Sequence, residues 1–149
     1  EDTASEASAK IAKELSNLFP IEYIKKALKT LPDKGFSSFD DLKKFLGSPG
    51  ENKAWHHIVE QNQIRNSNLP SQSVHNLKNI VSIPSGFKGS IHSKISGYYS
   101  SIQSFSDGKT VREWLRGKSF DEQLAFGINV LKKYGKLTAT ENGWLFEPF

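Results

Sequence analysis

Three stretches of the sequence decide the expected fold: Trp55-His56-His57-Ile58-Val59, Asn79-Ile80-Val81-Ser82-Ile83-Pro84 and Ile91-His92-Ser93-Lys94-Ile95. The first is a short apolar run interrupted by two histidines, and the second is rich in β-branched residues and ends at a proline. Both patterns are typical of strands. The third lies in a stretch that Ser85 can cap, and its apolar residues recur at helical spacing to about Ser100. The predicted order is therefore strand, loop, strand, helix, with histidines on the first strand and on the helix.

The segments that surround this unit are mostly helical. Residues 61–76, between the two strands, are polar and are expected to form a loop in which His75 is solvated. Further along, Thr110 and Ser119 each precede a glutamate by three residues, which predicts two capped helices. An Asn-Gly pair at 142–143 between two short β-rich runs predicts a C-terminal β-hairpin. The sequence thus predicts an α+β fold.

The N-terminal third of the chain has only helical patterns. The helices are expected at residues 4–18, 21–31 and 39–46. The stretch Ser48-Pro49-Gly50 that follows them has the clearest linker composition in the chain. We therefore expect a small helical subdomain at residues 1–48 and a second domain at residues 51–149.

Composition excludes several classes of function. The 149 residues are 36% hydrophobic and include ten phenylalanines, so a core can form and wholesale disorder is excluded. No window approaches 18 consecutive apolar residues, so we expect no membrane-spanning helix and no stable membrane association. Cysteine is absent, which excludes disulfides, cysteine nucleophiles and thiolate zinc sites. Methionine is also absent, and we expect the chain to be a domain cut from a longer polypeptide.

The basic charge is concentrated in the middle of the chain. Residues 51–104 have two acidic side chains against five basic ones, and they contain all four histidines. Such a segment favours a phosphate-bearing partner, because each lysine or arginine near a phosphate releases condensed counterions. The candidate phosphate contacts are Arg65, Lys88 and Lys94. One of the adjacent tyrosines 98 and 99 is expected to face the core, and the other, taken as Tyr99, is a candidate for stacking on a base.

The ordered histidine and asparagine stretches resemble the HNH/endonuclease VII superfamily, whose core is a ββα-metal fold. Trp55-His56-His57, followed by Ile58-Val59-Glu60-Gln61, resembles more closely the WHH group of nuclease domains. That group is found at the C-termini of bacterial polymorphic toxins, including contact-dependent growth inhibition and RHS-repeat proteins. Further stretches similar to this toxin group are at residues 75–80, 91–101, 110–115 and 119–123. The resemblance covers roughly residues 53–135 and implies a ββα-metal-like nuclease core with additional helices.

The resemblance also implies a role for each site residue. His56 would be a metal ligand, His57 the general base and His92 the second metal ligand. Asn79 would orient the base or help to hold the metal shell through its amide oxygen. These residue types suit phosphodiester hydrolysis, because a neutral imidazole can deprotonate water near pH 7 and a divalent ion can neutralise the charge of the transition state.

One position departs from the pattern of DNase colicins and their relatives. They often have a further ligand four residues after the helical histidine, where this chain has Ser96. The ion would then be held by His56 and His92 with waters, and with Asn79 or Glu60 contributing. That arrangement suits Mg²⁺ or weak binding better than a closed Zn²⁺ site, although both ions stay open.

The function expected from this resemblance is that of an antibacterial toxin nuclease, with DNA favoured over RNA. One alternative is a metal-independent RNase that cleaves transfer RNA with His57 and His92 as base and acid. A second alternative is a non-catalytic nucleic-acid-binding module. The toxin reading implies a cognate immunity protein as partner, secretion or surface display as part of a large parent protein, and action in the cytoplasm of a target bacterium.

Overall fold

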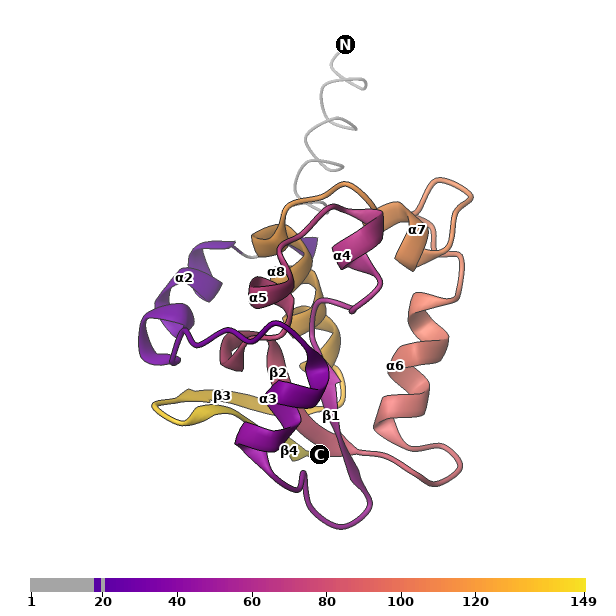
Figure 1. Ribbon diagram of the computed structural model, residues 1–149. Coiled ribbons are helices and arrows are strands. Elements are labelled where there is room, and N and C mark those ends of the chain that lie inside the picture. The colour runs from indigo at the N-terminus through magenta and orange to yellow at the C-terminus, as the bar shows by residue number, and fades with distance from the viewer. Residues whose placement is uncertain (1–17, 20) are drawn as a thin grey trace.

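The computed structural model describes residues 18–19 and 21–149 (Figure 1). The helix expected over residues 4–18 lies outside this range except for its last residue. The helices are α2 (Ile21–Thr30), α3 (Phe39–Leu46), α4 (Gln63–Asn66), α5 (Ser71–Val74), the short 3₁₀ helix η1 (Leu77–Asn79), α6 (Ile91–Tyr99), α7 (Val111–Leu115) and α8 (Phe120–Leu131). The strands are β1 (Lys53–His57), β2 (Ile80–Pro84), β3 (Gly135–Thr140) and β4 (Gly143–Pro148). The predicted α+β class is confirmed, and within the described residues no helix is long and apolar enough to cross a membrane.

The first sheet is the antiparallel pair β1–β2, and α6 packs against β2. The register places His56 opposite Val81 and His57 opposite Ile80. The helix begins later than expected, at Ile91, with the Ser90 hydroxyl accepting a hydrogen bond from a backbone N–H of the first turn. The delay has a backbone cause, because Gly86 and Gly89 have φ angles of 89° and 78°, which a right-handed helix excludes.

The second sheet is the C-terminal hairpin of β3 and β4, as predicted from the sequence. The β4 strand contacts β2, and β3 contacts both α2 and α8. Trp144 fixes the hairpin to the segment before β2, because its indole N–H donates to the carbonyl oxygen of Lys78 at 2.8 Å.

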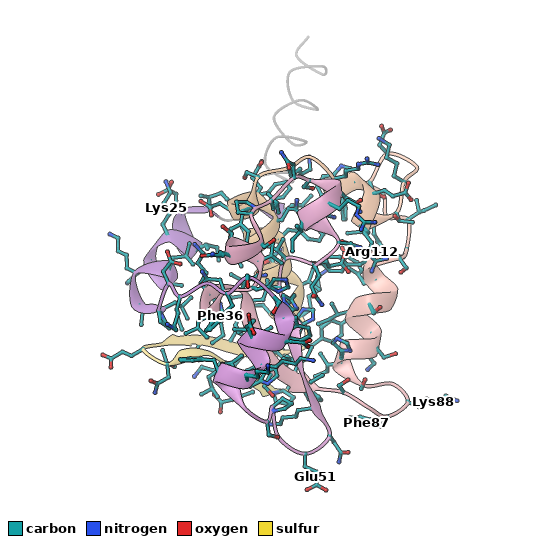
Figure 2. All side chains as sticks on the ribbon, viewed as in Figure 1. Lys25, Phe36, Glu51, Phe87, Lys88 and Arg112 are labelled. Carbon is teal, nitrogen blue, oxygen red and sulfur yellow. The ribbon has the colours of Figure 1, made fainter. Side chains whose placement is uncertain are left out.

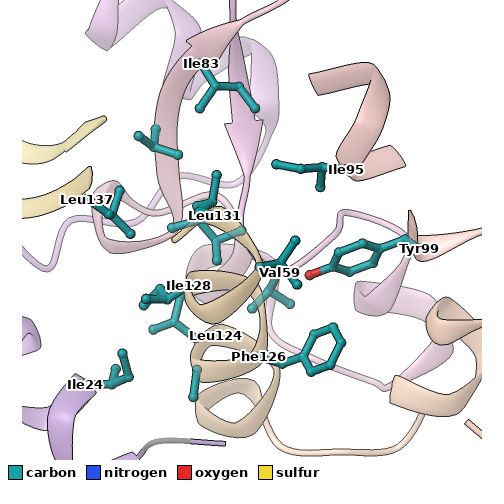
Figure 3. Close-up of a cluster of buried hydrophobic side chains, with 14 of the residues drawn as sticks. Ile24, Val59, Ile83, Ile95, Tyr99, Leu124, Phe126, Ile128, Leu131 and Leu137 are labelled. Atoms are coloured by element: carbon teal, nitrogen blue, oxygen red, sulfur yellow. The ribbon is translucent and has the colours of Figure 1, made fainter. Parts of the chain in front are cut away.

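The main hydrophobic core surrounds α8 (Figure 3). This helix begins with a complete capping box between Ser119 and Glu122. Side chains from α2, α6 and the strands close around it in Figure 3. The segment after β1 approaches α8 so closely that a Cβ added at Gly127 would lie 2.6 Å from a methyl carbon of Ile58. Position 127 of α8 therefore requires a glycine, because the segment that follows β1 packs directly against it.

A second, smaller core joins α3 to the histidine strand and its partner. Leu42 of α3 is fully buried with Leu77 and Ile80. The indole N–H of Trp55 donates to the carbonyl oxygen of Gly47 at 2.9 Å. A boundary at Ser48-Pro49-Gly50 would cut through this core, so the described part of the expected N-terminal subdomain is packed as one unit with the rest of the chain.

Candidate functional site

A pocket of about 570 Å³ lies between α3 and α6, with β1 along its base. Figure 1 shows β1 passing between these two helices. The lining side chains include Phe39, Lys43, His56, His57, Glu60 and His92. The pocket therefore brings together three of the four residues that the sequence predicted as catalytic.

His56 and His92 meet on the α6 side of the pocket. Their ring centroids are 5.6 Å apart, and the rings are edge to face at 84°. Nδ1 of His92 is 3.4 Å from the hydroxyl of Ser85. Burial, together with the smaller effect of the neighbouring His92, lowers the pKa of His56 to about 3. His56 is therefore neutral at pH 7, which is the form of imidazole that binds metal ions.

His57 lies on the opposite side of β1, toward α3, as expected for adjacent residues of a strand. Its ring meets the Phe39 ring edge to face at 4.5 Å between centroids. Burial, together with the smaller effects of the nearby His75 and His56, lowers the pKa of His57 to about 3. Since His57 is the last residue of β1, it still lines the same pocket as His56.

His75 is the functional candidate that sequence reasoning missed. It was expected to be solvated, but it is only 6% exposed, and its Nδ1 is 3.1 Å from Nε2 of His57. Burial lowers its pKa. The polar stretch around it folds into α4 and α5 instead of a loop. The apolar neighbours Val74 and Leu77 were the sequence signal for this burial, because both are core residues.

Asn79 is fully buried and bonds only to backbone. Its Oδ1 accepts from the N–H of Val59 at 2.8 Å, and its Nδ2 donates to the carbonyl oxygens of Val59 and Val74 at 3.0 and 2.9 Å. The amide oxygen is therefore directed at Val59 and not at a metal shell. Asn79 acts on the site through the backbone, because it joins the segment after His57 to the segment before His75.

Replacing Asn79 with alanine is expected to destabilise the fold by at least about 3 kcal/mol. Three buried backbone groups would lose their partner, and each unsatisfied group costs about 1–3 kcal/mol. Urea unfolding measures the loss. The matched control is Asn142→Ala, whose exposed side chain predicts a change within about 0.5 kcal/mol. Equal unfolding midpoints for wild type and Asn79→Ala would show that Asn79 does not hold these two segments together.

Glu60 lines the pocket, but both of its carboxylate oxygens are occupied. Nε and Nη2 of Arg112 donate to them, each at 2.8 Å. Nη1 of Arg112 donates to the hydroxyl of Ser100 at 2.9 Å, and Figure 2 shows Arg112 near the C-terminal end of α6. The hydrogen bonds to Glu60 raise the pKa of Arg112. Glu60 thus ties the segment after β1 to α7, with each of its two oxygens hydrogen-bonded to Arg112.

The predicted phosphate contacts lie outside the pocket. Lys88 projects from the loop before α6 in Figure 2, Lys94 is exposed on α6, and Arg65 is exposed on α4. Two lysines that were not singled out, Lys43 and Lys53, line the pocket itself. Positive charge therefore lies both in the pocket and on the surface beside α6.

Tyr99 is a core residue. It is 3% exposed, and its ring meets Phe126 edge to face with 5.8 Å between centroids. Burial raises its pKa. Stacking on a base would need this ring to leave the core, so the predicted nucleic-acid contact is incompatible with the packing. The neighbouring Tyr98 is only half-buried, with the ammonium of Lys133 4.7 Å from its ring centroid.

The separation of the His56 and His92 rings is in the range expected for two imidazoles that share one metal ion. Two imidazoles that share one tetrahedral ion at about 2.1 Å from each nitrogen have ring centroids roughly 5–6 Å apart, and these two are 5.6 Å apart. Across residues 18–19 and 21–149, no group of three or more histidine, aspartate or glutamate side chains could hold a metal ion. Waters or phosphate oxygens would have to complete the coordination.

No family model, curated protein or solved structure gives a significant match to this chain. A function for this chain therefore has to be inferred from the geometry of the pocket and from the sequence motifs.

Proposed function

We propose that this chain is an endonuclease domain that hydrolyses phosphodiester bonds of nucleic acid, with DNA as the favoured substrate. The observation that carries the proposal is the meeting of His56, His57 and His92 at one pocket of a strand–strand–helix unit. The separation of His56 and His92 suits one shared ion, while His57 lies on the other side of the strand. Metal binding and proton abstraction from water, the two roles that hydrolysis needs, can thus come from different side chains.

A divalent ion, Mg²⁺ or Zn²⁺, would be held by His56 and His92 and would supply charge neutralisation at the phosphate and at the leaving oxygen. His57 takes the proton of the attacking water, since its ring is neutral at pH 7. An anionic phosphate in the pocket favours the protonated ring, which raises the pKa of His57 toward the range useful for a general base. Lys43 and Lys53 attract the phosphate into the pocket.

The test of this function is the digestion of plasmid DNA and of total RNA by the purified chain, each with and without EDTA. DNA cleavage that stops in EDTA is the expected result. Cleavage of neither substrate at any concentration of Mg²⁺ or Zn²⁺ would contradict the proposal.

Replacing His92 with alanine is expected to lower metal affinity or activity by at least about 10–100-fold, because it removes one of two imidazole ligands. Activity should recover in part at raised metal concentration. Ser96→Ala, an exposed change on the same helix, is the matched control and should leave the metal dependence unchanged. A His92→Ala variant with the wild-type metal dependence would show that His92 holds no ion.

A metal-independent RNase is the second candidate, and the presence of only two imidazoles at the proposed metal site favours it. In that reaction His57 and His92 would act as base and acid on an RNA 2′-hydroxyl. RNA cleavage that persists undiminished in EDTA, with DNA left intact, would establish this mechanism in place of the metal-dependent one.

The biological setting that we propose follows from the resemblance of residues 53–135 to polymorphic toxins. The domain would be delivered as part of a large secreted or surface parent protein and would act in the cytoplasm of a target bacterium. A cognate immunity protein would protect the producing cell. Expression of the chain alone should arrest bacterial growth, and a His57 variant should not. A non-catalytic nucleic-acid-binding module would instead be equally toxic, or equally harmless, with and without His57.

A further inference from the structure

The histidine pair on the α3 side of the pocket has a geometry that constrains where its protons lie. Nε2 of His57 and Nδ1 of His75 are 3.1 Å apart, and the ring centroids are 5.2 Å apart. With the rings this far apart, the two nitrogens point at each other. A single proton lies between them, so one nitrogen donates and the other accepts.

The two possible tautomers have different consequences for His57. If His75 donates, the lone pair at Nε2 of His57 is occupied and Nδ1 of His57 carries the other proton, so the ring has no free acceptor. If His57 donates from Nε2, its Nδ1 is unprotonated. Within the described part of the chain, Nδ1 of His57 has no hydrogen-bond partner, and the residue lines the pocket. Only the second tautomer leaves a nitrogen that can take a proton there.

The position of His75 is fixed by its main chain and by aromatic packing. Its N–H donates to the carbonyl oxygen of Ser71 at 2.8 Å, and its carbonyl oxygen accepts from the N–H of Phe36 at 2.8 Å. The Phe39 ring lies parallel to the His75 ring at 6.3 Å between centroids and meets His57 edge-on. These contacts hold Nδ1 of His75 facing Nε2 of His57.

We propose that His75 is the positioning residue of the reaction: its Nδ1 accepts the Nε2–H of His57 and fixes the tautomer whose Nδ1 accepts the proton of the attacking water. The inference depends on the proposed nuclease function for its kinetic consequence, but not for its structural content. No carboxylate in residues 18–19 and 21–149 is hydrogen-bonded to either ring, so the orienting group is a neutral imidazole.

Nitrogen-15 NMR of the histidine-labelled wild-type chain at neutral pH tests the structural content directly. The expected spectrum has His57 protonated at Nε2 and not at Nδ1, and His75 unprotonated at Nδ1. A His57 ring that carries its proton on Nδ1 would overturn the proposal. The spectrum can be measured even if the chain cuts no nucleic acid. Failure of the proposed nuclease function and failure of the proposed hydrogen bond from His57 to His75 are therefore distinguishable.

Two substitutions of His75 test the kinetic consequence. His75→Asn places an amide oxygen near the position of Nδ1, whereas His75→Leu fills a similar volume without an acceptor. His75→Leu is expected to lower kcat about 10–100-fold with KM unchanged, the usual cost of losing the group that orients a functional imidazole. His75→Asn should restore most of kcat. Equal kcat losses in the two folded variants, or wild-type kcat in His75→Leu, would show that His75 is only a packing residue.

Discussion

Replacing His57 with glutamine is expected to slow phosphodiester cleavage by about 10²–10⁴-fold, the usual cost of removing a general base. Glutamine cannot take the proton of water near pH 7, but its amide can still bond to His75. Single-turnover cleavage of plasmid DNA at saturating metal measures the loss. The cleavage rate should fall while the affinity for DNA stays unchanged, because the proposed phosphate contacts in the pocket are lysines and not His57.

Glutamine is the better substitution because of how His57 is packed. An imidazole at a strand edge suggests, from sequence, a side chain that alanine could replace without harm. The structure shows instead that His57 is 7% exposed and packed edge-on against Phe39. Alanine would open a cavity there and would leave the buried Nδ1 of His75 without its partner.

The control for this experiment is Gln61→Ala, an exposed residue that also lines the pocket. Its cleavage rate should equal that of the wild type. A folded His57→Gln chain that binds DNA but does not cut it distinguishes an enzyme from a binding module. If that variant cuts at the wild-type rate, His57 is not the base.

The secondary structure was largely predictable because its signals are local. Ser38 and Gly47 mark the two ends of α3 in the sequence, and in the structure the Ser38 hydroxyl caps the first turn while Gly47 has a φ of 77°. Ser119 and Glu122 likewise form the capping box of α8. The spacing of apolar residues within one helix or strand needs no knowledge of distant segments.

The candidate site was predictable only in part because its contacts join distant segments. His57 and His75 are 18 residues apart, and Asn79 reaches back 20 residues to Val59. Neither contact follows from a pattern in the sequence. For the adjacent Tyr98 and Tyr99, the sequence likewise does not show which ring faces the core, because that depends on where α8 packs. The sequence could predict that the histidines of β1 belong to a site. It could not predict that His75 and Asn79 contact this strand and the segment after it and hold them in place.

Acidification is expected to destabilise the folded chain steeply below about pH 6. Burial lowers the pKa of His56 and of His57 to about 3 in the folded chain, whereas in the unfolded chain both have the ordinary value of 6.5. The unfolded chain therefore binds more protons between these values. The contribution to stability is complete above pH 6.5 and is lost as the pH falls toward 3. Each histidine contributes up to about 1.4 kcal/mol per pH unit.

Urea unfolding at pH 7, 6 and 5, in EDTA to keep both imidazoles free of metal, measures this slope. Two buried rings predict a loss of up to about 2.7 kcal/mol per pH unit, and His75 acts in the same direction because burial lowers its pKa too. The matched variant is His57→Gln, which removes one of the two largest contributions and should reduce the slope by roughly half. The difference between the slopes of the two chains gives the contribution of His57 together with its interactions with His56 and His75. Parallel slopes would mean that His57 is protonated as easily in the folded chain as in the unfolded one, which contradicts a buried, neutral ring beside His75.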